Sequence, residues 1–329
     1  MRSVLRARTS RLLAVVFVVL LLGTAGLQDA LASSVYWIDI GYDVGARKIQ
    51  RANLDGTGVT DLVTTDQIQP QQLALDVPGG KMYWTHTTNS SDDNIRRANL
   101  DGTAQENDFF VVNPGPDPKY ASPVGLALDP AGGKMYWADP EFNEICRTNF
   151  DGTGAKEQLY YTGPGISTDP VGIALDVAAG RVYWTDLKTQ QISRGNMDGS
   201  GVPEVLVTVS SPPYLRSGFE LDVAAGKMYW ANDTRVRRAN LDGSDIEDVV
   251  TGLTSAYTIA LDLSAEKLYW ADHDLGKIQR SNLDGTGIED VVTGLVNPSS
   301  IALQIDVISE PAGLGALGLA LLGLRKRRK

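Results

Sequence analysis

Cysteine and histidine are scarce in this chain. Of its 329 residues, one is a cysteine, Cys146, and two are histidines, His86 and His273. A single cysteine cannot form an intramolecular disulfide, and its place in a strand-like stretch predicts an inert, buried thiol. The Gly-x-Ser-x-Gly and His-Glu-x-x-His motifs are also absent from the sequence. These absences argue against nucleophilic hydrolases and zinc proteases of the kinds that carry those motifs.

Long hydrophobic runs are confined to the two ends. Near the start, four arginines precede an apolar run over residues 12–22 and the small-residue site Ala30-Leu31-Ala32. This order predicts a secretory signal peptide over residues 1–32, cleaved after Ala32. The alternative is an uncleaved membrane anchor, which the run fits less well because a span needs about 20 apolar residues.

A second processing segment is predicted at the other end. Ser309-Glu310-Pro311 precedes an apolar stretch over residues 312–324 and five basic residues. This order resembles the PEP-CTERM sorting signal of Gram-negative bacteria, although Ser309 stands where that signal has its first proline. The resemblance implies cleavage near Glu310-Pro311 by an exosortase and release to the cell surface or matrix. The alternative is a plain membrane anchor formed by residues 309–329.

The two basic ends hide a strongly acidic middle. The whole chain has a net charge of −10, and the ends contribute +3 and +4, so residues 33–309 carry −17. Such a charge argues against nucleic acid and anionic membrane surfaces as partners. It is compatible with cations and basic partners, and solubility alone would also account for it.

What the sequence does contain is a repeat. All six tryptophans follow a tyrosine, and each Tyr-Trp pair is followed by an Asn-x-Asp-Gly phrase. Five of the pairs are preceded by an apolar run that ends in aspartate, such as residues 73–76. A large residue confined to one place in each copy fills the same packing position six times: Trp37, Trp84, Trp137, Trp184, Trp230 and Trp270.

Each copy of about 46 residues predicts four antiparallel strands, with no helical period. The apolar run suits a strand buried on both faces, and the Asp-Gly phrase suits a hairpin turn. One such sheet cannot bury both of its faces, but six arranged radially can. The sequence therefore predicts an all-β, six-bladed β-propeller over residues 33–308. The first copy lacks its apolar run and the chain ends with an extra one, so residues 299–305 should close the first blade.

The repeat resembles a known family. The phrase Tyr183-Trp184-Thr185-Asp186, the Ile-x-Arg strands and the Asp-Gly-Thr turns are similar to the YWTD repeat, the class B repeat of low-density-lipoprotein receptors. The resemblance covers residues 35–305, in phase in all six copies. It implies a six-bladed propeller that binds extracellular ligands.

Loop lengths distinguish the two faces of the expected ring. The aspartate that ends each run precedes the next tyrosine by seven residues in all five complete copies, whereas the loops after Tyr-Trp and before each apolar run vary in length. Because turns alternate sides in an up-and-down sheet, both variable sets should share one face, the variable-loop face. Variable loops on a rigid scaffold favour binding there, although these loops could simply drift in length. The candidate ligand residues are His86, Asp92, Asp93, Tyr120, Phe142, Tyr160, Tyr161, Tyr214, Arg216 and His273.

Carboxylates recur at two places in the repeat. One set ends the apolar runs, and a second set follows Tyr-Trp, with His86 and Asn232 in two copies. A residue repeated in every blade has the same role in each, so we interpret both sets as structural hydrogen-bonding groups rather than a catalytic or metal site. The resemblance implies a blade-joining role for the second set: Asp39, Asp139, Asp186 and Asp272.

One carboxylate departs from the repeat. Glu220 stands where the other five copies have alanine, and Arg216 stands in the same copy where four others have proline. The position predicts a carboxylate near the central channel. Two interpretations remain open: Glu220 pairs with Arg216, or it helps to bind a channel ligand or cation.

Together these features predict an exported binding or adhesion module, monomeric and non-enzymatic, at the cell surface or in the extracellular matrix. Its expected partner is an extracellular protein or polysaccharide, and membrane contact is expected only through the terminal segments. We expect no cofactor, with calcium in the channel as the exception left open. The alternatives are a metal-dependent lactonase-like hydrolase with a channel cation and a structural matrix protein without a discrete ligand; fold analogy alone cannot support the former.

Overall fold

The computed structural model describes residues 33–41, 47–65, 69–87, 93–112, 122–163, 168–209 and 215–305. The predicted signal peptide and the predicted sorting or anchor segment at 309–329 lie outside these ranges and stay predictions. Within the described ranges, no helix has the length and apolar character that a membrane span requires.

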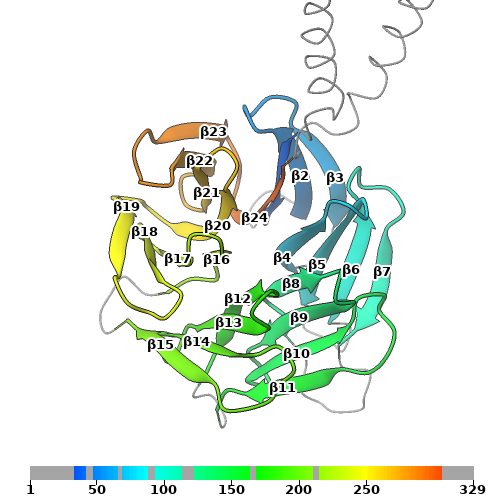
Figure 1. Ribbon diagram of the computed structural model, residues 1–329. Helices are drawn as coiled ribbons and strands as arrows, with labels where there is room; N and C mark the ends of the chain where they lie inside the picture. The colour runs from blue at the N-terminus through cyan, green and yellow to red at the C-terminus, as the bar shows by residue number, and fades with distance from the viewer. Residues whose placement is uncertain are drawn as a thin grey trace, which may run out of the picture. The chain divides into compact units, whose positions relative to one another are not determined.

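The described strands form six four-stranded antiparallel sheets, which surround a common axis as the blades of a propeller (Figure 1). Blade 1 consists of β24 (Pro298–Gln304), β1 (Ser34–Asp39), β2 (Arg47–Asn53) and β3 (Thr60–Thr65), and blade 2 of β4 (Gln69–Asp76), β5 (Lys81–Thr87), β6 (Asn94–Asn99) and β7 (Glu106–Val111). Blade 3 consists of β8 (Leu126–Asp129), β9 (Lys134–Asp139), β10 (Glu144–Asn149) and β11 (Glu157–Tyr161), and blade 4 of β12 (Pro170–Asp176), β13 (Arg181–Asp186), β14 (Gln191–Asn196) and β15 (Glu204–Thr208).

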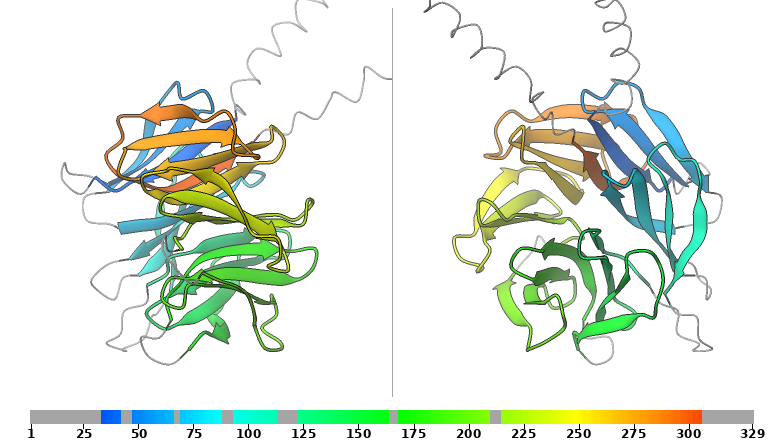
Figure 2. Two further views of the ribbon diagram at one scale, coloured as in Figure 1. Left: turned by 90° about the vertical axis from the view of Figure 1, so that its left-hand side faces the viewer. Right: turned by 45° about the vertical axis from the view of Figure 1, so that its right-hand side comes forward.

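Blade 5 consists of β16 (Phe219–Asp222), β17 (Lys227–Asn232), β18 (Arg235–Asn240) and β19 (Glu247–Thr251), and blade 6 of β20 (Ala256–Asp262), β21 (Lys267–Asp272), β22 (Lys277–Asn282) and β23 (Glu289–Thr293). In every blade the apolar run is the inner strand, Tyr-Trp lies in the second strand and the strand after the Asp-Gly turn is the outer strand. Figure 2 shows the same arrangement in two further views, with the connections at the two ends of the strands. The predicted six-bladed architecture is confirmed.

The hydrophobic core lies between blades rather than within them. Successive strand residues point to opposite faces, so the tyrosine and the tryptophan of one pair enter different interfaces. Tyr83 of blade 2 shares a buried cluster with Trp137 of blade 3, and Tyr269 of blade 6 shares one with Trp37 of blade 1. Six such clusters pass around the ring. All six tryptophans are at most 3% exposed. The repeat therefore encodes one interface six times.

The ring is closed by the two ends of the propeller. Strand β24 pairs with β1, with Ser34 opposite Gln304 and Tyr36 opposite Ala302. The Tyr36 hydroxyl also donates to the side-chain oxygen of Gln304 at 2.9 Å. The first blade is therefore completed by the last strand, as the missing first run and the extra last run predict.

Arginines on the third strands add polar links between blades. Arg280 of blade 6 donates to the Leu54 carbonyl of blade 1 at 2.9 Å, and Arg147 of blade 3 donates to the Met197 carbonyl of blade 4 at 2.7 Å. Arg194 and Arg238 make the corresponding bonds to Leu241 and Leu283. The Ile-x-Arg phrase thus supplies a hydrophobic residue to the core and a cation to the next blade.

Candidate functional site

The connections of the ring separate into two faces. Within a blade, the turn after the inner strand is hydrogen-bonded to the Asp-Gly turn, as in the 3.1 Å bond from Leu100 N to the Gly80 carbonyl. We call the face with these two turns the constant-turn face. The other connections are bonded to each other, as in the 3.0 Å bond from His273 N to the Ser255 carbonyl, and they define the variable-loop face. In the described parts of these connections, both sets of variable-length loops thus lie on one face, as their lengths predict.

The recurrent aspartates hold the backbone. On the constant-turn face, the aspartate that ends each inner strand caps the turn that follows it; Asp129, for example, accepts the Gly132 N–H at 2.8 Å. On the variable-loop face, Asp39 of blade 1 accepts the N–H groups of Val296 and Asn297 at 3.0 and 2.9 Å. These two residues connect blade 6 to β24, so Asp39 fixes the junction between blades.

The other three carboxylates of the second set make the same kind of contact. Asp139 accepts from Ser122 N at 3.1 Å, Asp186 from Asp169 N at 3.0 Å and Asp272 from Thr254 N at 3.3 Å. Each donor lies in the loop that enters the same blade. Burial raises the pKa of Asp139 to about 6, although the backbone bonds from Ser122 and Phe142 act in the opposite direction. These carboxylates are engaged with backbone, which leaves them poorly placed for catalysis.

Two sequence candidates meet at the variable-loop face between blades 5 and 6. Arg216, which precedes β16, forms an ion pair with Asp233 in the loop after β17. The Arg216 guanidinium carbon also lies 4.9 Å from the centre of the Tyr257 ring. That ring stacks on His273 with the ring centres 5.0 Å apart, and His273 Nδ1 lies 2.9 Å from an Asp274 oxygen. We call these five residues, Arg216, Asp233, Tyr257, His273 and Asp274, the mouth cluster.

A cavity adjoins the mouth cluster on its blade 4 side. It encloses about 440 Å³, and its lining residues are Leu187, Lys188, Gln190, Leu215, Arg216 and Asp233. The Leu215 N–H donates to Gln190 Oε1 at 2.8 Å, and this bond between two lining residues joins the loops of blades 4 and 5. The cavity therefore combines an apolar wall with two cations and a carboxylate, a suitable surface for a peptide with polar and apolar groups.

The candidates in blade 3 divide between surface and interior. Tyr161, the last residue of β11, is 55% exposed at the variable-loop end of the blade. Phe142 is half-buried, and Lys156 Nζ lies 4.8 Å from the centre of its ring. Tyr160 is only 5% exposed and stacks on Trp184 of the next blade. The prediction that Tyr160 faces a ligand is therefore wrong, because its side chain fills the interface between blades 3 and 4.

Two further candidates are also interior residues. His86 is 1% exposed and Asp93 is 2% exposed, at the end of β5 and just before β6. His86 occupies the position that aspartate has in four other copies, and that position points into the blade junction rather than outward. These two residues are corrected from surface to interior. Asp92, Tyr120 and Tyr214 lie outside the described residues and stay predictions.

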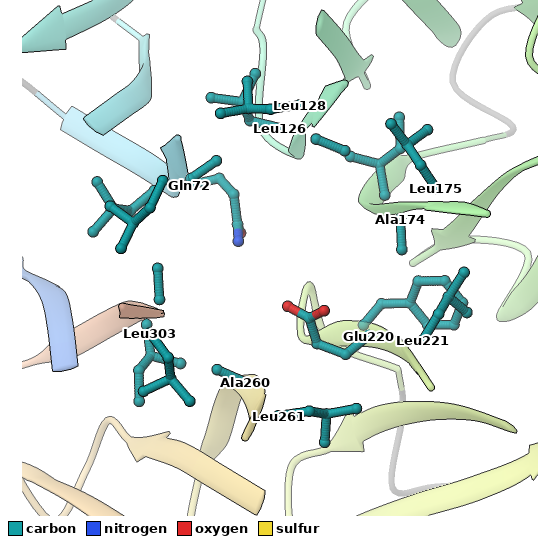
Figure 3. Close-up of a pocket in the computed structure, with 18 of the residues that line it drawn as sticks. Gln72, Leu126, Leu128, Ala174, Leu175, Glu220, Leu221, Ala260, Leu261 and Leu303 are labelled. Carbon is teal, nitrogen blue, oxygen red and sulfur yellow. The ribbon is translucent and has the colours of Figure 1, made fainter. Parts of the chain in front are cut away.

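The central channel contains Glu220. The channel has a volume of about 360 Å³, and Figure 3 shows the Glu220 carboxylate projecting into it. Arg216 pairs with Asp233, so the suggested Arg216–Glu220 ion pair is wrong. Solvent can reach Glu220 inside the channel, yet protein surrounds it, and burial raises its pKa to about 7. Within the ranges that the structure covers, no group of three or more His, Cys, Asp or Glu side chains could hold a metal ion.

The lone thiol has no reactive partner in the described structure. Cys146 is fully buried, and its Sγ lies 3.3 Å from a Glu144 carboxylate oxygen. Burial and that carboxylate raise the pKa of Cys146 far above its usual range. A protonated, buried thiol is not a nucleophile, so the inert thiol predicted from the sequence is confirmed.

Sequence reasoning missed Gln72, Asp233 and Tyr257. Gln72 lines the channel where the other five copies have glycine, threonine or serine, so the position-by-position comparison that identified Glu220 could also have identified it. Asp233 adopts a positive φ of 35° in a two-residue connection, and its ion pair depends on that local geometry. Tyr257 lies 16 residues before its stacking partner His273, and only the sheet register brings them together.

No protein-family model matches the chain. Low-density lipoprotein receptor-related protein 5 of Mus musculus is 34% identical over 122 residues, which are 35% of this chain and 7% of that protein. Low-density lipoprotein receptor-related protein 5-like protein of Homo sapiens is 35% identical over 118 residues, 36% of this chain and 41% of that protein. The chain thus spans less than half the length of either relative. These similarities and the six repeats support the YWTD-type propeller that the sequence resembles.

Solved structures agree on the fold. A chain of the nidogen/laminin complex has a TM-score of 0.69 at 22% identity, covering 83% of this chain and 99% of that one. A protein from Bacteroides uniformis assigned as a 6-phosphogluconolactonase has a TM-score of 0.56 at 12% identity, covering 82% and 98%. The two relatives described above are receptor-related proteins, and the lactonase likeness is one of fold alone. Both findings agree with the prediction of a non-enzymatic chain.

Proposed function

We propose that the chain is an extracellular or cell-surface binding module that recognises a protein through its variable-loop face. The observation that carries the proposal is the mouth cluster, because it presents side chains that no other blade repeats. Arg216 and Tyr257 are partly exposed and held in place by contacts with Asp233 and His273. Arginine and tyrosine held rigidly beside a cavity are typical of binding hot spots.

The comparisons support a protein as the partner. The curated relatives are receptor-related proteins, and one structure that shares the fold is a chain of a complex between nidogen and laminin. The net charge of −17 over residues 33–309 disfavours nucleic acid. Export through the predicted signal peptide would place the module outside the cell, and residues 309–329 would either anchor it or be removed. We expect the module to act as a monomer, because the loops of a single ring form the whole variable-loop face and no second copy is needed to complete it.

Two matched surface variants test this proposal. The full chain is immobilised and probed separately with the secreted proteins and with the purified envelope polysaccharide of its source cells. The first variant removes three partly exposed side chains of the mouth cluster: Arg216→Ala, Tyr257→Ala and His273→Ala. The second removes three exposed apolar groups from the constant-turn face: Val177→Ala, Val223→Ala and Leu263→Ala. Circular dichroism and thermal unfolding establish that both variants are folded.

We expect a defined secreted protein to bind the wild type and the constant-turn variant, and the mouth variant to bind at least tenfold more weakly. Loss of binding only in the constant-turn variant would overturn the assignment of the face. Binding to polysaccharide alone would replace the protein by a surface polymer. Retention of every interaction by both variants would favour a structural matrix component without a discrete ligand.

A further inference from the structure

All six blades contribute aliphatic side chains to the wall of the central channel. Each inner strand contributes a leucine one residue before its end, and these leucines are Leu75, Leu128, Leu175, Leu221, Leu261 and Leu303. Val177, in the turn after β12, lines the channel toward the constant-turn face, and Ser217, before β16, lines it toward the variable-loop face. The space is therefore a channel of about 360 Å³ with a band of leucine side chains, large enough for a small organic molecule.

Two polar side chains break this symmetry. Figure 3 shows Glu220 of blade 5 and Gln72 of blade 2 pointing into the channel from opposite walls. Neither side chain has a hydrogen bond or ion pair with another residue of the described ranges. Glu220 is also the sole titratable side chain among the described residues that line the channel. The repeat does not need either group, because the other copies have alanine in place of Glu220 and small residues in place of Gln72.

We expect an unpartnered carboxylate at this place to lower the stability of the fold. Burial raises the pKa of Glu220 to about 7, which reports the difficulty of keeping a charge there without a partner. Alanine, which the other five blades have at this position, carries no charge and therefore has no such cost. A group that lowers stability and lies in a cavity is a candidate ligand contact.

We propose that the channel binds the primary ammonium group of an aliphatic amine. The Glu220 carboxylate is its counter-ion, the Gln72 side-chain carbonyl accepts a second N–H, and the leucines contact the alkyl chain. This site is separate from the mouth cluster, so either can fail without the other. An ammonium group has three donors and no acceptor, and water in the channel can accept the third.

The number of oxygen groups favours ammonium over a divalent metal. Calcium takes six to eight oxygen ligands, whereas the side-chain oxygens of the described lining are those of Glu220, Gln72 and Ser217. The wall also favours an organic cation, since each methylene of an alkyl chain gains from contact with leucine. Burial of one methylene corresponds to about a fourfold gain in affinity.

The amine could be a free alkylamine or the side chain of a lysine in a peptide that enters the channel. n-Butylamine has the chemistry of a lysine side chain, and Nα-acetyl-lysine N-methylamide carries the same group on a peptide backbone. Binding of both probes would indicate that the channel can bind the lysine side chain of a partner protein. Binding of the free amine alone would restrict the ligand to small molecules.

The test is isothermal titration calorimetry and thermal unfolding of the full chain at pH 8. The probes are n-butylamine, n-hexylamine, Nα-acetyl-lysine N-methylamide, n-butanol and calcium chloride. Glu220→Ala is the matched variant, because it restores the residue that five blades already have and should fold at least as well. Glu220→Gln keeps the shape without the charge, and Gln72→Ser introduces the residue found at the equivalent position of blade 1, Ser300.

We expect both amines to bind the wild type and to raise its unfolding temperature, with hexylamine binding more than tenfold more tightly than butylamine. Both Glu220 variants should lose at least tenfold in affinity and Gln72→Ser a few-fold. At pH 7 amine binding should release protons, because Glu220 must give up its proton to pair with ammonium; titrations in buffers of different ionisation enthalpy measure this release. Equal binding of butanol, or amine binding that survives Glu220→Ala, would overturn the proposal. A Glu220-dependent response to calcium without one to amines would replace it by a metal site.

Discussion

On the constant-turn face the blades repeat the same contacts, whereas on the variable-loop face the exposed side chains differ from blade to blade. The Asp-Gly turns on the first face lie against the outer strand of the preceding blade; a Cβ on Gly285 would lie 1.8 Å from the Val249 carbonyl oxygen. On the second face, the repeating aspartates bind backbone beneath the loops, and above them blade 6 has His273 and blade 3 has Phe142. Repetition therefore marks the contacts that hold the ring together, and departure from repetition marks surface available for recognition.

The largest effect should follow a change at an Asp-Gly turn. Gly285 has φ +82° and its added methyl group would collide with backbone of blade 5. We expect Gly285→Ala to lower the free energy of unfolding by at least about 3 kcal/mol, since left-handed strain and overpacking add. Urea unfolding of the full chain measures this loss.

Gly80 is the control for that variant, because it has φ +66° and no atom lies within 4 Å of the added Cβ. Gly80→Ala should cost only about 1–2 kcal/mol, from backbone strain alone. Equal losses in the two variants would show that contact between blades at the Asp-Gly turn contributes nothing.

The channel carboxylate should give the next largest effect, and it depends on pH. The folded pKa of Glu220, about 7, is above its ordinary value of 4.5, so the folded state binds the proton more tightly than the unfolded state. The wild type should therefore lose stability as pH rises from about 4.5 to 7, by up to about 3 kcal/mol. Below that window the group is protonated in both states and has no cost.

Glu220→Ala removes this dependence. Its stability relative to the wild type should rise between pH 4.5 and pH 7.5 and then stay constant. Chemical unfolding at a series of pH values measures the difference, which cancels the contribution of Asp139, whose raised pKa has the same sign. A constant difference across the window would mean that the Glu220 carboxylate is well solvated in the channel.

Polar links between blades should give a moderate effect. Arg280 of blade 6 bonds the Leu54 carbonyl of blade 1 and the Tyr269 hydroxyl, and it pairs with Glu289. We expect Arg280→Met to cost about 1.5–3 kcal/mol, the range for hydrogen bonds from a charged group. Glu289→Gln, which removes only the charge of the exposed partner, should cost much less than Arg280→Met, because water and salt screen an exposed ion pair. A similar loss in both would place the stabilisation in the surface ion pair and not in the ring closure.

The comparison of the two faces also explains which features of the molecule can be predicted from the sequence. Trp37, Asp39 and the closing strand were predictable because each occupies a position that the repeat defines six times. Glu220 was predictable as an exception to that pattern, and Gln72 could have been. The mouth cluster was only half predictable, because the contact of Arg216 with Tyr257 depends on how adjacent inner strands lie side by side. Loop length shows which face varies, but it does not show which way a side chain points.

Two adjacent tyrosines test whether the direction of a side chain matters where the sequence does not show it. Their substitution should have the smallest effects on the free energy of unfolding. Tyr160 and Tyr161 share a strand end, and the sequence does not distinguish them as surface candidates. The Tyr160 hydroxyl accepts the Asn196 N–H at 2.7 Å in the turn of blade 4, whereas Tyr161 is 55% exposed. The Tyr160 hydroxyl also donates to the Ser200 carbonyl at 3.0 Å. We expect Tyr160→Phe to cost about 1–2 kcal/mol, since each such hydrogen bond contributes about 1 kcal/mol net, and Tyr161→Phe to stay within about 0.5 kcal/mol of the wild type. Urea unfolding of both variants measures the difference, and Tyr161→Phe is the control for loss of a hydroxyl at this edge. Equal stabilities would mean that the hydroxyl bonds across the interface of blades 3 and 4 add nothing to the packing of the Tyr160 ring on Trp184.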